Sequence, residues 1–535
     1  MKQLKIELIQ KAKEILFTPF ISIAKEFRWS YLPPLMVYLA AGISGLTGIV
    51  GIFFVKDYLN LSAAFLAGLG FWTGIPWALK MPLGHLVDLI WNKKNYLVVV
   101  GAALISLSLL IMYGLIVHTK YMATFVSVET WFVISSILAP VGYVIQDVVA
   151  DAMTVEAIPI KNADGQVFSP QIIKSMHTTM QTLGRFSIIG GTVLVSLANV
   201  IMFSNIANLS EAEKITIYGN IYLYALIIPF ISLSGIMLAS YLKNSNNFSA
   251  NNKTVITKPN WWILGGSLIF VIFTVGIGTS KIKFAQEIIF FGSMTIIIFL
   301  MKNLIKEMPL QMKNTVIGTA IAIFAFRAVP NIGPGNGWFE IDILGFDQQF
   351  LSLLALISAL LTLLGILFFR EFMAKNSISK IIIVLSVAGS VLLLPSIGMY
   401  YGIHHWTASA TNGIVDAKFI AIINTAVESP LGQVSMIPLL AWIAKNAPSH
   451  LKATFFAVFA SFTNLALSAS SLLTKYLNEI FIITREVKDK ISNMIVTKQD
   501  YSELGILMIV VMIITLIMPL FTVFIIQKSK LKTNE

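Results

Sequence analysis

Long apolar runs separated by short polar segments repeat along the chain. They fall near residues 34–55, 62–82, 96–117, 130–156, 171–203, 217–242, 261–279, 284–302, 313–330, 349–369, 379–400, 416–443, 452–475 and 504–527. Most are about 20 residues long, the length at which an α-helix crosses the hydrocarbon core of a bilayer. The pattern therefore predicts an all-α, polytopic membrane protein with fourteen spans, arranged as six, two and six.

The polar segments divide the predicted protein into parts. Its expected parts are a cytoplasmic amphipathic N-terminal segment (1–33), a six-helix bundle (34–243), a cytoplasmic linker (244–260), an inserted helix pair (261–302), a second six-helix bundle (303–527) and a cytoplasmic tail (528–535). The linker is rich in Asn, Ser and Lys, a composition typical of a flexible connection. The N-terminal segment is basic and amphipathic, which favours a helix lying on the membrane surface.

Composition agrees with a membrane protein and excludes several kinds of site. Hydrophobic residues make up 56% of the chain and charged residues 12%, about half the charged fraction of soluble domains. The chain has no cysteine, which excludes disulfides, thiolate metal sites and cysteine nucleophiles. The six histidines have no metal-ligand spacing, so we expect neither a metal nor a cofactor.

The net charge of +12 comes from small clusters of Lys and Arg between the apolar runs. This distribution is typical of cytoplasmic loops and not of a nucleic-acid-binding surface, and it predicts that both termini lie in the cytoplasm. Lys80 counts among the cytoplasmic cations on this interpretation, and Arg485 among those of an outer loop. Three cations remain at membrane depth, Arg185, Arg327 and Lys418.

The fourth run carries two acids within a membrane span. Tyr143, Asp147, Asp151 and Thr154 recur at helical spacing and would share one stripe of a helix. Carboxylates at membrane depth are costly unless they meet water, a cation or a proton. We therefore expect this stripe to line a polar pathway, the alternative being a helix end whose acids lie among the cytoplasmic headgroups.

The fifth run supplies a cation at similar depth. Helix rise places Arg185 level with Asp147, so an ion pair between them is feasible. Gln181 and Arg185 belong to one polar stripe that should face the bundle interior. Arg185 could be a structural partner of Asp147, a ligand of the solute, or both.

The second half also carries charges inside its apolar runs. Arg327 is expected near the outer end of the seventh core helix, and Asp416, Lys418 and Glu428 on the tenth, which continues to Gln433. For Asp416 the residues favour a simple cap at the outer end of its helix. Four carboxylates would then face three cations. Because a carboxylate without a cation tends to take up a proton, Asp151 or Glu428 is the expected proton-coupling group.

Several stretches resemble known transporters. Gly84, Asp88, Lys93 and Lys94 resemble the signature loop of the major facilitator superfamily, although Leu89 stands where that signature has a basic residue. Phe53 to Asp88, Phe326 to Leu354, Gly432 to Leu465 and QDVVADA in the fourth run are similar to the folate–biopterin transporter family, and the fourth run also to the related muropeptide permeases.

The resemblance implies proton-coupled import of an anionic, folate- or pterin-like solute by alternating access, in a cell inner or plasma membrane. It places family charges at Asp147, Asp151, Arg185 and Arg327. The expected solute-binding residues are Arg185, Arg327, Gln181, Tyr143 and Gln433; the expected proton-coupling or ion-pair residues are Asp147, Asp151, Glu428, Lys418 and Asp416; the expected conformational gating loop holds Gly84, Asp88, Lys93 and Lys94.

Other functions stay open at this point. A muropeptide or other organic-anion permease would share the same mechanism, and a channel would need a continuous polar lining. Gly42-Ile43-Ser44-Gly45 resembles the serine motif of an intramembrane hydrolase, although the chain otherwise lacks enzyme signatures. Gly42, Gly45, Gly48 and Gly51 also recur every three residues, which favours close packing of the first span on a neighbour.

Overall fold

The computed structural model describes residues 27–532 except 60, 79, 160–165, 245–260, 281, 307, 433, 435–451 and 489–493. The predictions for most of the N-terminal segment, for nearly all of the linker and for Gln433 therefore lie outside the described residues.

The first half of the chain forms six helical passes, several of them built from two helices. These are α2 (Leu32–Ile43) with α3 (Gly48–Tyr58), α4 (Ala63–Ala78) with α5 (Lys80–Leu89), α6 (Asn95–Val117), α8 (Val128–Glu156), α9 (Pro170–Met202), and α10 (Glu211–Tyr224) with α11 (Ile227–Asn244). Short helices lie before or between them: η1 (Trp29–Tyr31), η2 (Ser44–Thr47), η3 (Trp91–Lys93), α7 (Thr119–Met122) and η4 (Ile206–Asn208).

An inserted pair and six more passes follow. The pair is α12 (Trp261–Thr279) and α13 (Ala285–Leu304), and the passes are α14 (Leu310–Arg327), α16 (Gln348–Phe368), α18 (Ile378–Leu392) with α19 (Leu394–Tyr400), α21 (Ala417–Glu428) with η5 (Ser429–Leu431), α23 (Lys452–Ile480) and α24 (Leu504–Lys528). The connections carry α15 (Pro334–Asp342), α17 (Arg370–Lys375), α20 (Ile403–Ala410) and an antiparallel hairpin of β1 (Val487–Lys488) and β2 (Ile495–Thr497).

The predicted all-α arrangement of six, two and six passes is confirmed. Eight helices of the described residues are long and apolar enough to cross a membrane unaided. The first pass is one of these eight, although it changes to a tighter 3-10 turn at Ser44–Thr47. Other helices are shorter, such as α4, which contains Pro76.

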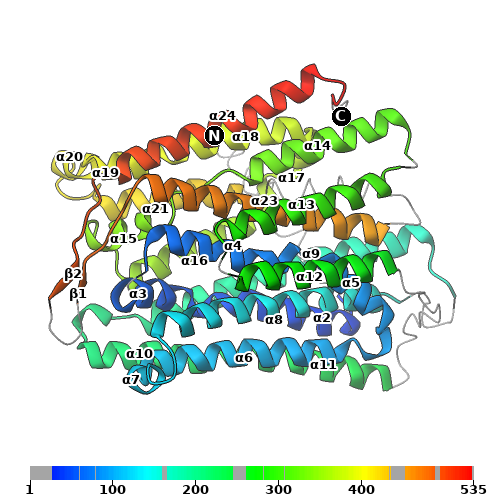
Figure 1. Cartoon of the computed structure of the whole chain (residues 1–535), viewed down its shortest axis with the longest axis horizontal. Coiled ribbons are helices and arrows are strands. Elements are labelled where there is room, and N and C mark those ends of the chain that lie inside the picture. Colours follow the sequence, from blue (N-terminus) through cyan, green and yellow to red (C-terminus); the bar gives the residue numbers. More distant parts are fainter. Residues whose placement is uncertain are drawn as a thin grey trace, which may run out of the picture.

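The helices run mostly lengthwise through the molecule, with the two halves side by side (Figure 1). In this view α6, α8 and α11 lie below, α14, α18 and α24 lie above, and α4, α12, α13 and α23 lie between. We call the end that carries β1 and β2, on the left, the hairpin end. The last turns of α11 and α24 lie at the opposite end, which we call the termini end.

Each half has its own apolar core. That of the first half includes Val50, Phe54 and Ile105, all nearly inaccessible to solvent. That of the second includes Val316 and Phe459 and also takes in side chains of α13. The halves meet along two seams, where α4 packs on α23 and α9 packs on α16.

Close packing at a glycine, expected for the first span, is found at Gly42. A Cβ at this position would collide with the carbonyl oxygen of Ile188 on α9, and one at Gly191 would collide with α2. Gly48 has open space instead. The glycine stripe therefore brings backbones together only where α2 crosses α9.

The two halves are joined by polar contacts at the hairpin end. Lys56 at the end of α3 forms an ion pair of 2.6 Å with Asp342 at the end of α15. The buried Gln348 donates a hydrogen bond of 2.6 Å to the hydroxyl of Tyr218, which lies in the other half. Arg485, between α23 and β1, donates to several backbone carbonyls at the end of α3. The hairpin end is therefore closed in this conformation.

Candidate functional site

A lysine from the second pass joins the two acids of the fourth. Lys80 Nζ lies 2.6 Å from Asp147 Oδ2 and 2.7 Å from Asp151 Oδ2. The hydroxyl of Tyr38 on α2 donates a hydrogen bond of 2.6 Å to Asp151 Oδ1. Three passes of the first half thus converge on one network, which we call the Lys80 cluster: Lys80, Asp147, Asp151 and Tyr38.

Helix geometry explains how the acids meet one cation. Asp147 and Asp151 are four residues apart on the unbroken α8, so their carboxylates lie one above the other on the same face. Lys80 is the first residue of α5, and the preceding helix α4 ends at Ala78. Its flexible stem can therefore place a point charge between the two carboxylates.

The members of the cluster differ in their access to solvent. The side chain of Asp151 is 45% exposed, whereas those of Lys80 and Asp147 are 22% and 18% exposed. Asp147 is therefore the more enclosed partner of the lysine. Asp151 touches the same lysine and is the more exposed of the two acids.

The predicted ion pair between Asp147 and Arg185 is not among the ion pairs of the described residues, and Lys80 takes the place of the arginine. Arg185 lies within electrostatic range of Asp147 and Tyr38. Its guanidinium therefore remains available beside the Lys80 cluster as a second positive charge.

Sequence reasoning missed Lys80 because the positive-inside rule counted it as a cytoplasmic loop residue. A signal was present, since Lys80 lies within the apolar run 62–82. Its inclusion gives four cations for the four carboxylates, so the predicted excess of one carboxylate disappears. Tyr38 was also missed, and only its contact with Asp151 distinguishes it from other tyrosines of the apolar runs.

Neither Tyr143 nor Gln181, two other predicted residues of the first half, contributes to the contacts of the Lys80 cluster among the described residues. Tyr143 packs against the apolar core of the first half and lies close to Ser44. The helix α9 contains Gln181, but its side chain lies outside the described part. Gln146, which precedes Asp147 in α8, is buried and donates a hydrogen bond to the carbonyl of Val98. This is a structural contact between α8 and α6.

The predicted charges of the tenth core helix do not form a cluster. Asp416 caps the start of α21, where Oδ1 accepts a hydrogen bond of 2.8 Å from the amide of Phe419. Lys418 is exposed and lies 5.3 Å from the centroid of the Phe350 ring. Glu428 is the exposed last residue of α21. No ion pair within the described ranges includes any of these three residues.

Arg327 is the last residue of α14, in keeping with its expected place near a helix end. The favoured interpretation of Asp416, as a helix cap, agrees with its hydrogen bond. The structure therefore gives Asp416 a local role and leaves Lys418 and Glu428 without contact to the Lys80 cluster.

The expected gating loop is mostly helical. Gly84 and Asp88 lie within α5, and the side chain of Asp88 lies outside the described part. Lys93 is exposed in η3. Lys94 forms an ion pair of 2.6 Å with Glu156 and lies 4.4 Å from the centroid of the Trp91 ring. It therefore ties the start of α6 to the end of α8 at the termini end.

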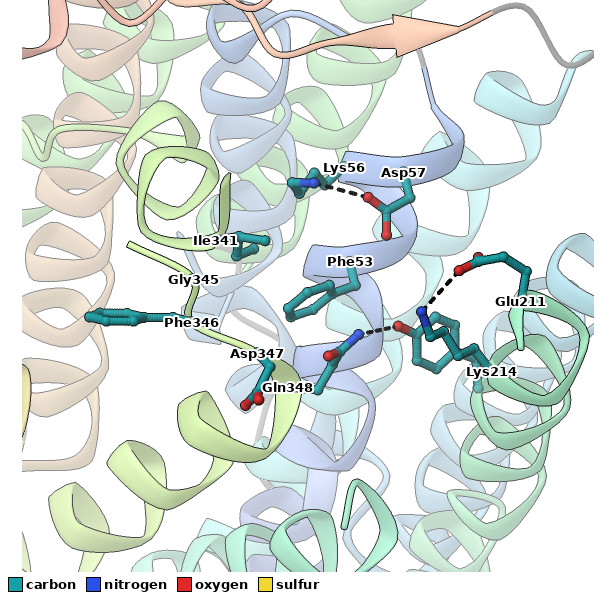
Figure 2. Close-up of a pocket in the computed structure, with 11 residues that line it drawn as sticks. Phe53, Lys56, Asp57, Glu211, Lys214, Ile341, Gly345, Phe346, Asp347 and Gln348 are labelled. Carbon is teal, nitrogen blue, oxygen red and sulfur yellow. Dashed lines mark hydrogen bonds and ion pairs between the residues drawn. The ribbon is translucent and has the colours of Figure 1, made fainter. Parts of the chain in front are cut away.

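A second polar site lies between the halves at the hairpin end. It is a cavity of about 250 Å³ whose walls come from α3, α10 and the segment from Ile341 to Gln348. Figure 2 shows the ion pairs of Lys56 with Asp57 and of Lys214 with Glu211, together with the hydrogen bond that Gln348 makes across the cavity. Two of the carboxylates of this cavity, Asp57 and Glu211, are paired with its lysines, and Asp347 accepts a hydrogen bond from the amide of Phe350.

Comparison with known proteins agrees with the fold. Residues 41–535 match the sequence model described as the BT1 family. The chain is 22% identical over 459 residues to a protein of Synechocystis sp. named "Folate-biopterin transporter", which covers 84% of this chain and 75% of the relative.

Solved structures share the architecture at low identity. A POT family transporter in complex with a thioalcohol-conjugated peptide superposes with a TM-score of 0.59 and 12% identity, over 94% of this chain and 96% of that one. A D-xylose-proton symporter gives a TM-score of 0.52 and 15% identity, over 92% and 95%. These likenesses identify the fold as that of the major facilitator transporters.

Proposed function

Because the chain belongs to the BT1 family, we propose that it imports an anionic, folate- or pterin-like solute together with protons. That the protein is a membrane transporter, and not an enzyme, follows from its family. The hydrolase suggested by Ser44 is thereby set aside, and the Ser44 hydroxyl donates to the carbonyl of Ala41 in the preceding helix α2.

The observation that carries the proposal is the shared lysine of the Lys80 cluster. Lys80 contacts two carboxylates at once, and the more accessible of them is Asp151. A solute carboxylate of the same charge and geometry can replace Asp151 at the ammonium group. Asp151 then takes up a proton, because an ionised carboxylate without its cation is costly in this setting.

This exchange couples one proton to one negative charge of the solute. The proton stays on Asp151 while the solute carboxylate occupies Lys80, and both leave when Asp151 ionises and returns to the lysine. Arg185 provides a second cation beside the cluster for a further acidic group or a ring oxygen of the solute. Arg327, Gln181 and Gln433 are the proposed solute contacts from the remaining walls of the pathway.

Alternating access fits the two-bundle fold and the closed hairpin end. In the proposed cycle, the seams between the halves open alternately at the hairpin end and at the termini end around the Lys80 cluster. We place both termini in the cytoplasm and the protein in the cell inner or plasma membrane, because Lys and Arg favour the segments on that side.

Uptake into proteoliposomes tests the function directly. The purified protein is reconstituted, an inward proton gradient is imposed, and radiolabelled pterins, folates and peptidoglycan fragments are supplied in turn. We expect saturable uptake of a pterin or folate that stops when a protonophore collapses the gradient. Uptake that ignores the gradient would overturn the coupling, and uptake that does not saturate would indicate a channel.

A muropeptide or other organic anion is the second candidate solute. The fourth span, which carries the two acids of the Lys80 cluster, resembles that of the muropeptide permeases, and the cluster itself would recognise negative charge rather than a pterin ring. Competition separates the two candidates. If an unlabelled anhydromuropeptide abolishes uptake of the labelled solute and a folate does not, the protein carries peptidoglycan fragments.

A further inference from the structure

The inserted pair lies over the seam where the two halves meet. The helices α12 and α13 pack on each other, α12 also packs on α5 of the first half, and α13 packs on α23 of the second. One apolar cluster combines Phe71 of α4, Phe270 of α12, Ile289 of α13 and Leu472 of α23. The pair therefore contacts both halves at once, and Figure 1 shows α12 and α13 in the middle of the view with α4 and α23.

Two consecutive residues at the start of α13 make polar contacts with opposite halves. Gln286 Nε2 donates a hydrogen bond of 2.9 Å to the carbonyl of Gly68 on α4. Glu287 Oε1 accepts a hydrogen bond from the hydroxyl of Tyr476 and lies 3.4 Å from Lys475 Nζ, both on α23. Consecutive side chains point about 100° apart around a helix, so this first turn faces both sides of the seam.

The seam beneath this turn is narrow. Side chains at Gly70 and Gly74 would meet the hydroxyl oxygens of Ser471 and Ser468 at 3.4 Å and 3.3 Å. A Cβ at Gly68 would meet the side chains of Gln286 and Lys475 at 3.4 Å, so α4, α13 and α23 pass close together at this level. Opening the hairpin end would separate α4 from α23 at this level. The first turn of α13 cannot then stay bonded to both helices.

We propose that α12 and α13 form a clamp that holds the hairpin end of the transporter closed. Glu287 and the apolar face of α13 fix the clamp to the second half, and the hydrogen bond from Gln286 to Gly68 is the link that breaks on opening. The inserted pair thus sets the balance between the two access states. The inference rests on alternating access, but not on the identity of the solute or on proton coupling.

The clamp is tested by labelling one introduced cysteine, since the chain has none of its own. Ala63 of α4 is 2% exposed and packs among Trp338 and Ile483 of the second half, so Ala63→Cys reports opening of the hairpin end. The protein is held in lipid nanodiscs without solute, where a maleimide reaches both ends. The rate of labelling then measures how often the seam opens.

We expect Gln286→Ala to raise the labelling rate about fivefold, the effect of removing one hydrogen bond worth about 1 kcal/mol. Tyr476→Phe, which leaves α4 untouched, should act in the same direction by loosening Glu287 from α23. Thr295→Ala is the matched control, because Thr295 is exposed on α13 and bonds only its own helix at Phe291.

If both Gln286→Ala and Tyr476→Phe label at the rate of Thr295→Ala, the pair is not a clamp and only lines the protein against lipid. Because no solute or proton gradient is present, that outcome leaves the proposed function intact. If Gln286→Ala and Tyr476→Phe label faster but the protein imports no folate or pterin, the clamp is supported and the proposed solute is wrong.

Discussion

The guanidinium of Arg485 lies 4.5 Å from the centroid of the Trp338 ring. Its N–H groups reach four backbone carbonyls of the other half, those of Val55, Lys56, Leu59 and Leu61. Arg485 is only 3% exposed, although it belongs to a connection and not to a membrane pass. A buried arginine of the second half therefore caps the end of α3 in the first half.

Arg485→Lys should weaken the closed state of the hairpin end. A lysine keeps the charge but lacks the planar fork of donors, so most of the four carbonyls would lose their partner while still buried. We expect the Ala63→Cys reporter to be labelled at least about tenfold faster. Lys498→Ala, an exposed change in the same connection, is the control. Equal rates for both variants would mean that Arg485 serves local folding only.

Lys80→Met should abolish uptake. The change leaves Asp147 and Asp151 facing each other without the cation that both contact. Breaking a pair of this kind by removing one partner is strongly unfavourable. We expect uptake in proteoliposomes to fall at least about tenfold, with Lys80→Arg retaining part of it. Lys120→Met, at an exposed position of α7, should transport normally. Normal uptake by Lys80→Met would remove the cluster from the mechanism.

Asp151→Asn should separate solute movement from proton movement. An amide can still accept the hydrogen bond from Tyr38 but cannot take up a proton. We expect a variant that exchanges labelled for unlabelled solute but gains nothing from an imposed proton gradient. The comparison is with Asp500→Asn in the hairpin connection. If the gradient still accelerates uptake by Asp151→Asn, another group carries the proton.

Gly42→Ala and Gly48→Ala should have opposite effects on stability. A methyl group at Gly42 collides with the backbone of α9, whereas at Gly48 it meets nothing within 4 Å. Overpacking of the first kind costs about 1–3 kcal/mol. Replacing an exposed helical glycine by alanine gains up to about 1 kcal/mol. Thermal unfolding in detergent measures the stability of both variants. An unfolding midpoint unchanged by Gly42→Ala would show that the two passes can move apart.

Glu340 makes stability depend on pH at the hairpin end. Burial raises the pKa of Glu340 to about 7, against the lowering effect of its hydrogen bond from Asn336. The folded protein therefore holds a proton that the unfolded chain has already released above the usual pKa of a glutamate. Stability from this group is present at acid pH and is lost as pH rises towards 7.

Glu340→Gln should remove that dependence. The amide stays neutral and can still accept from Asn336, so the variant avoids the cost of an ionised, buried carboxylate. We expect its unfolding midpoint to exceed that of the unmodified protein by about 2 °C or more at pH 8. At pH 4.5 the two midpoints should agree. A constant difference across this range would assign the effect to packing and not to ionisation.

The positions of the charges show how far sequence alone reaches. Asp147 and Asp151 were expected on one stripe, and both contact Lys80, because helical periodicity is a local property. Their partner was not predicted, since the second, fourth and fifth passes can meet in several rotations. The positive-inside rule counts charges by their place along the chain. It therefore assigned Lys80 to a loop, and it gave no sign that Arg485, which does lie in a connection, is buried.

The sequence by itself determined the six, two and six passes and the all-α class, because an apolar run of about 20 residues in a bilayer has no other way to satisfy its backbone. Only the tertiary structure decided which charges meet. It placed Lys80 between the acids of α8, buried Arg485 against the end of α3, and laid the inserted pair across the seam of α4 and α23. Such choices depend on how helices rotate and pack against distant segments, which local patterns do not specify.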